Sequence, residues 1–339
     1  MEKLNKYIKH YFRTIYYTKS DAFSLTMLHS DFVEIVKECS SLEKYLVEIF
    51  DTYKRLSNDE QKYIYKGVKR NNFIEKLCGS LVEPVHYEDI PGSIRKLLKK
   101  FFYYLYDDLI GTVAYETACC SFHDYHQDFL KENESVAFCP FCGLFPLTNQ
   151  GVKYRDDYDH FFPRSIYIFN SVNIKNLIPM CNICNSKVKR DKDIIYRGNN
   201  RSNRRKVYYP YRNNSDNVKI GDVKVTMDFD NTGHIEIQLH YPLELSEEME
   251  AWIDIFDIIN RYKGVMSGSC KRWNERFRKK YKRSICKESS LNFSDFVKDE
   301  LLCIEDRGFE ERSFLEKAYL EYITQLDSFE SDLKETVGM

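Results

Sequence analysis

The sequence has no apolar run that approaches the ~20 residues a helix needs to span a membrane, which excludes a helical membrane protein. It has no glycine-rich phosphate-binding loop, so we expect no ATP binding by this chain. The formal net charge is −1, so any nucleic-acid surface must come from local patches of Lys and Arg. The first residues, Met1 to Asn5, lack the apolar stretch of a secretory signal, which favours a cytoplasmic protein.

Four of the 11 cysteines form two CxxC pairs, the most informative feature of the sequence. Cys139 and Cys142 make the first pair, and Cys181 and Cys184 make the second. A CxxC pair can turn both sulfurs toward one point, and two pairs supply the four thiolates of a structural zinc site. The remaining cysteines are scattered, and without an export signal we expect reduced, buried thiols. The sequence therefore predicts structural Zn²⁺ on the four paired cysteines.

The residues between the two pairs include groups suited to chemistry on phosphate. Asp159 and His160 are adjacent, and Pro163 follows, which predicts a strand that ends in a loop. Neighbouring side chains point to opposite faces within a strand, but at a strand end both can converge on one site. A carboxylate can hold Mg²⁺, and a neutral imidazole can take a proton from water. Asn185 would lie beside this strand end if a helix starts near Cys184.

The order of these elements resembles the zinc-knuckle version of the HNH endonuclease family, whose core is a ββα-metal fold. The pattern is CxxC, then DH with a proline three residues after the histidine, then NL-x-P-x-CxxCN-x-K, over roughly Phe138 to Arg190. The resemblance implies that His160 is the general base and that Asp159 and Asn185 hold catalytic Mg²⁺ or Mn²⁺. It also implies that Asn176 braces the loop that carries His160. The family often has His at the last position, so Asn185 leaves open which divalent ion is preferred.

Basic residues occur at two places that could meet a nucleic-acid backbone. The first group follows the second CxxC pair, where a solvated helix is the alternative interpretation. The second lies in residues 270–283, where aromatic residues at spacing four predict a helix with one apolar face. That helix could lie along phosphates, or it could dock by its aromatic face with the charges outside. The candidate nucleic-acid-binding residues are Lys187, Lys189, Arg190, Lys271, Arg272, Arg276 and Arg278.

Residues 1 to about 130 predict helices, because apolar residues recur at spacings of three and four. One such stripe consists of Leu42, Tyr45, Leu46, Ile49, Phe50 and Tyr53. Ser57 or Asn58 could cap the next helix, with Glu60 in its first turn. The region is rich in Tyr and Phe, which at helical spacing are more often core than base-stacking residues. We interpret it as a scaffold or docking region.

A second metal site is one interpretation of Cys119, Cys120, His123 and His126, which lie just before the first CxxC pair. On a continuous helix Cys119 and His123 are four apart and His123 and His126 three apart, so they would share a face. The alternative, which we favour, is a helix packed against the core with two cysteines inside it. The four paired cysteines already complete one metal shell.

The C-terminal part predicts a hairpin followed by helices. Residues 223–229 and 234–240 alternate apolar and polar residues around a turn at Asp230 to Gly233. From Ser246 onward helical stripes dominate. The predicted fold is α+β and mostly α-helical, with a central ββα-metal core and its four-Cys zinc site flanked by helical regions. The predicted domains are a helical scaffold (1–130), the HNH nuclease domain (131–212), and a hairpin-plus-helix domain (213–339).

The predicted function is hydrolysis of phosphodiester bonds in nucleic acid, DNA rather than RNA, by a metal-dependent endonuclease. The order of the Tyr208-Tyr-Pro-Tyr211 segment, the hairpin and the Trp252 helix resembles HNH nuclease subunits of bacterial anti-phage systems of the Septu type. This second resemblance implies a separate ATPase subunit that gates the nuclease. The alternative is a zinc-stabilised nucleic-acid-binding or assembly module that does not cleave.

Overall fold

Helices make up most of the computed structural model, which describes residues 1–119, 121–132, 138–147, 158–198, 201–212, 223–287 and 291–337. Two small antiparallel sheets complete the described structure, so the prediction of a mostly helical chain is confirmed. By internal contacts the chain divides into a first unit, Met1–Ala137 with Leu147–Arg212, and a second unit, Phe138–Pro146 with Asn213–Met339. The predicted three domains stay a prediction. In the described residues, no helix has the length and apolar character to cross a membrane.

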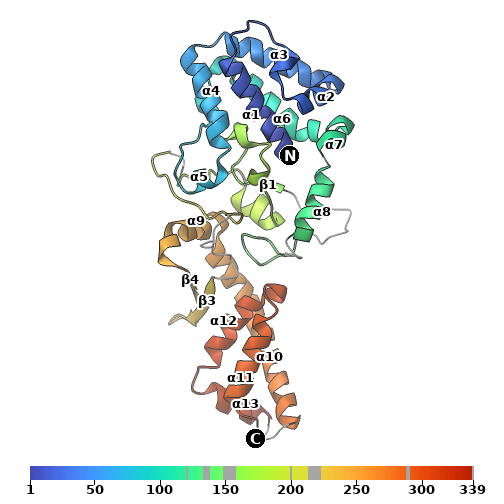
Figure 1. The fold of residues 1–339 in the computed structure, drawn as a ribbon. Helices are drawn as coiled ribbons and strands as arrows, with labels where there is room; N and C mark the ends of the chain where they lie inside the picture. Colours follow the sequence, from blue (N-terminus) through green and yellow to red (C-terminus); the bar gives the residue numbers. More distant parts are fainter. Residues whose placement is uncertain are drawn as a thin grey trace. The chain divides into compact units, whose positions relative to one another are not determined.

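The N-terminal part of the first unit is built from helices, as the apolar spacing predicts. They are α1 (Glu2–Tyr17), α2 (Ser30–Glu38), α3 (Ser40–Lys54), α4 (Asn58–Asn71), α5 (Ile74–Cys78), α6 (Gly92–Asp107), α7 (Val113–Cys119) and α8 (Phe122–Glu132). α1 packs against α4, and α3 against α6 (Figure 1). Ser57 caps α4: its hydroxyl accepts from the N–H of Glu60, and the Glu60 carboxylate accepts from the N–H of Ser57. This capping box satisfies two backbone donors that the first turn leaves without helical partners.

A single apolar core connects these helices to the segment that carries Asp159 and His160. The predicted stripe of α3 is buried in it, together with Phe102 of α6, except for Tyr45, which is half-buried and packs against the core. Phe169, from the short 3₁₀ helix η4 (Ile168–Asn170), stacks edge-on against Phe102 with 5.6 Å between ring centroids. A side chain on Gly67 of α4 would place its Cβ 2.8 Å from the Phe169 ring, so glycine permits this close approach of α4 to η4. The helices therefore fix the position of η4.

A buried polar cluster fastens the residues after Arg190 to the helical part. The Tyr167 hydroxyl donates to the Asp193 carboxylate at 2.7 Å, and His86 Nε2 lies 3.2 Å from the same hydroxyl. Burial is the main cause that lowers the pKa of His86 to about 4, and Arg201 lowers it further. His86 is therefore neutral at pH 7, with Asp193 and Tyr167 as its polar neighbours.

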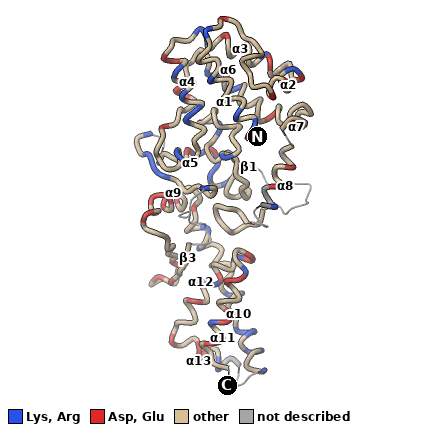
Figure 2. The backbone as a smooth tube through the Cα atoms, in the orientation of Figure 1, with Lys and Arg blue, Asp and Glu red and all other residues tan. Residues whose placement is uncertain are grey.

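The second unit contains the predicted hairpin and a set of helices. As predicted, β3 (Lys224–Phe229) and β4 (Ile235–His240) form an antiparallel hairpin; its register places Met227 opposite Ile237. The helices are α9 (Ser246–Phe256), α10 (Ile258–Lys287), α11 (Phe293–Glu305), α12 (Ser313–Ile323) and α13 (Phe329–Val337). The aromatic residues of α10 face inward: Trp273 packs against Tyr319, and Phe277 against Phe296. Lysines and arginines stand at many of the remaining positions of α10, the blue segments of the tube in Figure 2.

Candidate functional site

The four paired cysteines lie together and are buried. Their Sγ atoms are within 4.8 Å of one another. In the first pair, the Cys139 N–H donates to the Phe145 carbonyl at 2.9 Å, and the Gly143 N–H donates to the Cys139 carbonyl. Gly143 has φ +63°, a conformation that glycine adopts without steric cost. This tight turn is what directs both sulfurs of the pair to one side.

The donor set suits zinc. Tetrahedral zinc with Zn–S bonds of about 2.3 Å places its sulfur ligands about 3.8 Å apart, which is compatible with the observed separations. Backbone N–H groups approach two sulfurs at 3.5 Å: Leu144 N–H at Cys142 and Cys184 N–H at Cys181. Such contacts are typical of the outer shell of thiolate sites. The four cysteines can therefore bind a metal ion such as zinc.

Between the two pairs the chain forms a short hairpin that presents Asp159 and His160. β1 (Tyr158–His160) pairs antiparallel with β2 (Leu177–Pro179), and His160 lies opposite Leu177. Tyr158 and His160 are buried on one face, while Asp159 lies on the other with 13% of its side chain exposed. The strand alternation holds to its end, so Asp159 and His160 have different side-chain partners.

His160 is held by a backbone carbonyl in a single tautomer. Its Nε2 lies 2.9 Å from the carbonyl oxygen of Ser171, and because a carbonyl only accepts, Nε2 must carry the proton. The lone pair of the neutral ring is then on Nδ1, for which the described residues supply no hydrogen-bond donor. Burial lowers the pKa of His160 to about 3, so the ring is uncharged near pH 7. The edge of the Tyr106 ring packs against it, 4.5 Å between centroids.

Asn176 connects the loop after His160 to the second strand. Its Oδ1 accepts from the Phe162 N–H at 2.8 Å, and its Nδ2 donates to the Phe162 carbonyl at 3.1 Å. Its Nδ2 also lies 3.1 Å from Oδ1 of Asn170. The Asn176 side chain is fully buried, so these two hydrogen bonds replace water at both the N–H and the carbonyl of Phe162. The predicted bracing role for Asn176 matches this geometry.

The segment after the second cysteine pair is a wide turn rather than an α-helix. η6 (Ile183–Lys189) is a π-helix, and the Arg190 N–H donates to the Asn185 carbonyl five residues earlier at 2.8 Å. In this wider turn, residues five apart point the same way, and Cys184 and Lys189 are its buried positions. The Asn185 side chain is half-buried and makes no hydrogen bond among the described residues, which leaves its amide oxygen for a metal.

Lys189 is buried, whereas the sequence analysis predicted that it contacts nucleic acid. Its side chain is fully buried, with Nζ 2.6 Å from Oδ2 of Asp159 and 2.9 Å from the carbonyl oxygen of His160. Nucleic-acid contact by Lys189 needs an exposed ammonium, so we correct that expectation: the π-helix turns this lysine inward. Lys187 and Arg190 are exposed, and their predicted phosphate contacts stay predictions. Burial raises the pKa of Asp159 and lowers that of Lys189, and each charge offsets the shift of the other.

The helical face that the predicted second metal site needs is interrupted between Cys119 and His123. α7 ends at Cys119 and α8 begins at Phe122, so Cys119 and His123 are not on one continuous helix. Ser121 starts the new helix by accepting from the N–H of Asp124 at 3.0 Å. His126 faces the hairpin instead, with Nδ1 2.8 Å from the Tyr158 hydroxyl, which fits a helix packed on the core. Cys120 lies outside the described residues.

The basic residues predicted on α10 divide into two kinds. Lys271 and Arg272 are exposed and stay candidates for nucleic-acid contact. Arg276 pairs with the carboxylates of Glu311 and Glu316. Arg278 donates to Asn274 at 2.9 Å and lies over the Phe329 ring. Their guanidinium groups therefore have partners within the second unit, which reduces what they can offer to a phosphate.

The sequence analysis missed the residues that position His160 and are distant from it in the sequence. Ser171 and Lys189 hold the two ends of the His160 residue, and Tyr106 packs on its ring. No local spacing signals these contacts, because each joins segments brought together only by tertiary folding. No family model matches this chain, and neither a curated protein nor a solved structure matches it. The resemblance to HNH endonucleases therefore depends on the motif residues and stays a prediction.

Proposed function

We propose that this chain is a metal-dependent endonuclease of the HNH type that hydrolyses phosphodiester bonds in nucleic acid, with DNA as the expected substrate. The observation that carries the proposal is the His160 ring, fixed as a neutral base at the end of β1, directly after Asp159 in the chain. The hairpin and η6 that surround it lie along the chain in the order that the family pattern requires.

His160 acts as the general base. Its Nδ1 takes a proton from water, the resulting hydroxide forms a bond to phosphorus, and the bond from phosphorus to the leaving oxygen breaks. General-base catalysis of this kind contributes roughly 10²–10⁴-fold. The low pKa of the buried ring keeps it unprotonated. A phosphate anion beside the ring favours the imidazolium form, so substrate binding raises the pKa of His160 toward the range where a base is effective.

Asp159 and Asn185 would hold the catalytic ion. Carboxylate and amide oxygens are the hard ligands that Mg²⁺ and Mn²⁺ take, and both side chains are at least partly accessible. When bound there, the ion would neutralise the scissile phosphate and stabilise the leaving oxygen. Lys189 engages Oδ2 of Asp159 and the backbone N–H of His160 also donates to this carboxylate, so its remaining lone pairs are the ones left for a metal. Lys189 thus serves as a positioning residue for the carboxylate.

The test is cleavage of supercoiled plasmid and of RNA with Mg²⁺ or Mn²⁺. Wild type is expected to cleave, and His160→Ala should be at least ~10²-fold slower while retaining its zinc. His123→Ala is the matched control, because His123 is exposed on α8 and should leave both cleavage and zinc unchanged. Equal cleavage by wild type and His160→Ala would reject the mechanism. A wild-type protein that binds nucleic acid and zinc but never cleaves would favour the non-cleaving module.

A further inference from the structure

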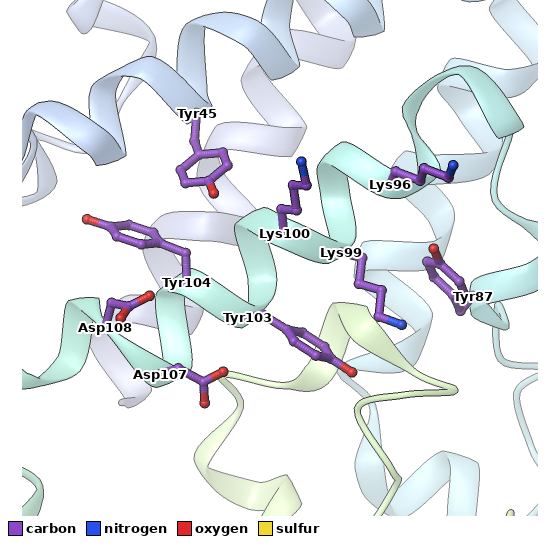
Figure 3. Close-up of a pocket in the computed structure, with 9 residues that line it drawn as sticks. All are labelled: Tyr45, Tyr87, Lys96, Lys99, Lys100, Tyr103, Tyr104, Asp107 and Asp108. Carbon is purple, nitrogen blue, oxygen red and sulfur yellow. The ribbon is translucent and has the colours of Figure 1, made fainter.

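The side of α6 that faces away from the core carries a line of positive charges. The buried positions of α6 are Ile94, Leu98, Phe101, Phe102 and Leu105. Lys96, Lys99, Lys100 and Tyr103 lie on the other side, at spacings of three and four that keep them together on the helix. They line an open hollow of about 410 Å³ with Tyr45 of α3 and Tyr87 of η2 (Tyr87–Asp89) (Figure 3).

Lys99 contacts aromatic rings rather than a carboxylate. Lys99 Nζ lies 4.9 Å from the centroid of Tyr87 and 5.5 Å from that of Tyr103, on the flank of α6 where Figure 3 shows the three side chains together. Lys96 and Lys100 are exposed. Within the described ranges, no carboxylate forms an ion pair with any of the three. Lys99 keeps its full charge over the rings, and Lys96 and Lys100 are exposed, so all three lysines are able to attract an anion.

A series of side-chain contacts leads from these lysines along α6 to His160. The Arg164 guanidinium lies over Tyr103 at 4.4 Å and over Tyr106 at 5.3 Å, and its Nη1 is 2.7 Å from Asp107. The Tyr106 ring contacts the His160 ring. From Lys96 to Tyr106 the helix rises about 15 Å, at 1.5 Å per residue. One end of this surface therefore meets the proposed general base.

We propose that Lys96, Lys99, Lys100 and Tyr103, the α6 basic track, bind the phosphate backbone of the nucleic-acid strand that flanks the bond near His160. The proposal rests on the function proposed above. A row of single charges matches a polymer with regularly spaced phosphates, and such contacts position a strand without reading its bases. Asp107 is paired with Arg164, and the other acidic residue of the hollow, Asp108, does not balance the three lysines.

A second hollow on the same helix extends the positive surface. It lies between α3 and α6, has a volume of about 510 Å³, and places Lys44 beside Lys96 and Lys100. Glu48 is the acidic residue among those that line it. Lys44 is exposed and, in the described part of the chain, has no ion-pair partner. A backbone that follows the track past Lys96 would therefore meet a further cation.

The test measures binding without cleavage, by fluorescence anisotropy of a labelled 20-nucleotide DNA, single-stranded and as a duplex. The full chain carries His160→Ala, and no Mg²⁺ is added. Lys96→Glu/Lys99→Glu/Lys100→Glu should weaken binding at least tenfold and reduce the slope of log K against log salt by about 2, since each contact contributes ~0.7–0.9. The matched control carries the same changes at the exposed residues Lys62, Lys66 and Lys69 of α4, and its affinity for DNA should stay within twofold of the parent protein's.

Three lysine-to-glutamine changes on the track keep good helix formers and remove only the positive charge, so they should also weaken binding. Equal effects of the α6 and α4 variants, or no binding by the parent protein to either DNA, would overturn the proposal. If the wild type never cleaves but the track variant still loses binding, the track stands and the nuclease function falls. If cleavage needs His160 but the track variant binds and cleaves like the α4 control, the function stands and the track falls.

Discussion

Breaking the ion pair between Lys189 and Asp159 is predicted to cause a large loss of stability. Lys189→Met keeps the length of the side chain but leaves the Asp159 carboxylate buried without its cation, and the His160 carbonyl without its donor. Removing one partner of a buried pair costs about 3–5 kcal/mol, because the remaining charge is left uncompensated. Asp159→Asn removes the other partner and should cost a similar amount. Lys187→Met, on the exposed side of η6, should stay within about 0.5 kcal/mol of wild type.

The double variant Lys189→Met/Asp159→Asn leaves no buried charge, so it should cost about 2 kcal/mol less than the sum of the two single changes. The free energy of opening can be measured from the urea dependence of hydrogen exchange in peptides that cover β1 and β2. This readout is needed because both tryptophans, Trp252 and Trp273, lie in the second unit and do not report on this hairpin. If the double variant costs the sum of the two single changes to within about 0.5 kcal/mol, the coupling between Lys189 and Asp159 is refuted.

Three further predictions follow from single contacts. Gly67→Ala should destabilise the first unit by about 1–2 kcal/mol in urea denaturation, since overpacking against Phe169 exceeds the gain in helix propensity; Gly264→Ala, which meets nothing within 4 Å, should stabilise α10. The pKa of His86 is lowered, so its share of stability is present above about pH 6.5 and lost toward pH 4; wild type should lose about 2 kcal/mol more than His86→Gln between pH 7.5 and 5. Cys184→Ser should abolish zinc binding in metal analysis of the purified protein, and retained zinc would show a different ligand set.

Local patterns predicted the elements whose causes are local. The Ser57 cap needs only Glu60 three residues later, and the hairpin at 223–240 needs only alternation and a turn. The spacing of the two CxxC pairs likewise predicted that their sulfurs lie together. In each case the residues that form the interaction are close in the sequence or belong to a pattern with one chemical solution.

The remaining features depend on contacts that no local pattern contains. Lys189 looked like a surface cation because the sequence does not show that η6 widens into a π-helix and turns it toward Asp159. On a continuous helix Cys119 and His123 would share one face, but a new helix begins at Phe122. The role proposed for the α6 track was also missed, because it depends on the contact that Tyr106, farther along α6, makes with His160 in the fold. Nucleic-acid contact by α10 and a partner ATPase stay predictions.

The most direct test of the central claim is the position of Mn²⁺ in a crystal of the full chain, located by anomalous scattering. The account predicts an anomalous peak about 2.1 Å from an Asp159 carboxylate oxygen and from the Asn185 amide oxygen. It also predicts that zinc occupies a separate position among the four cysteine sulfurs. Mn²⁺ bound elsewhere, with the Asp159 and Asn185 side chains directed away from each other, would contradict the proposed hydrolysis.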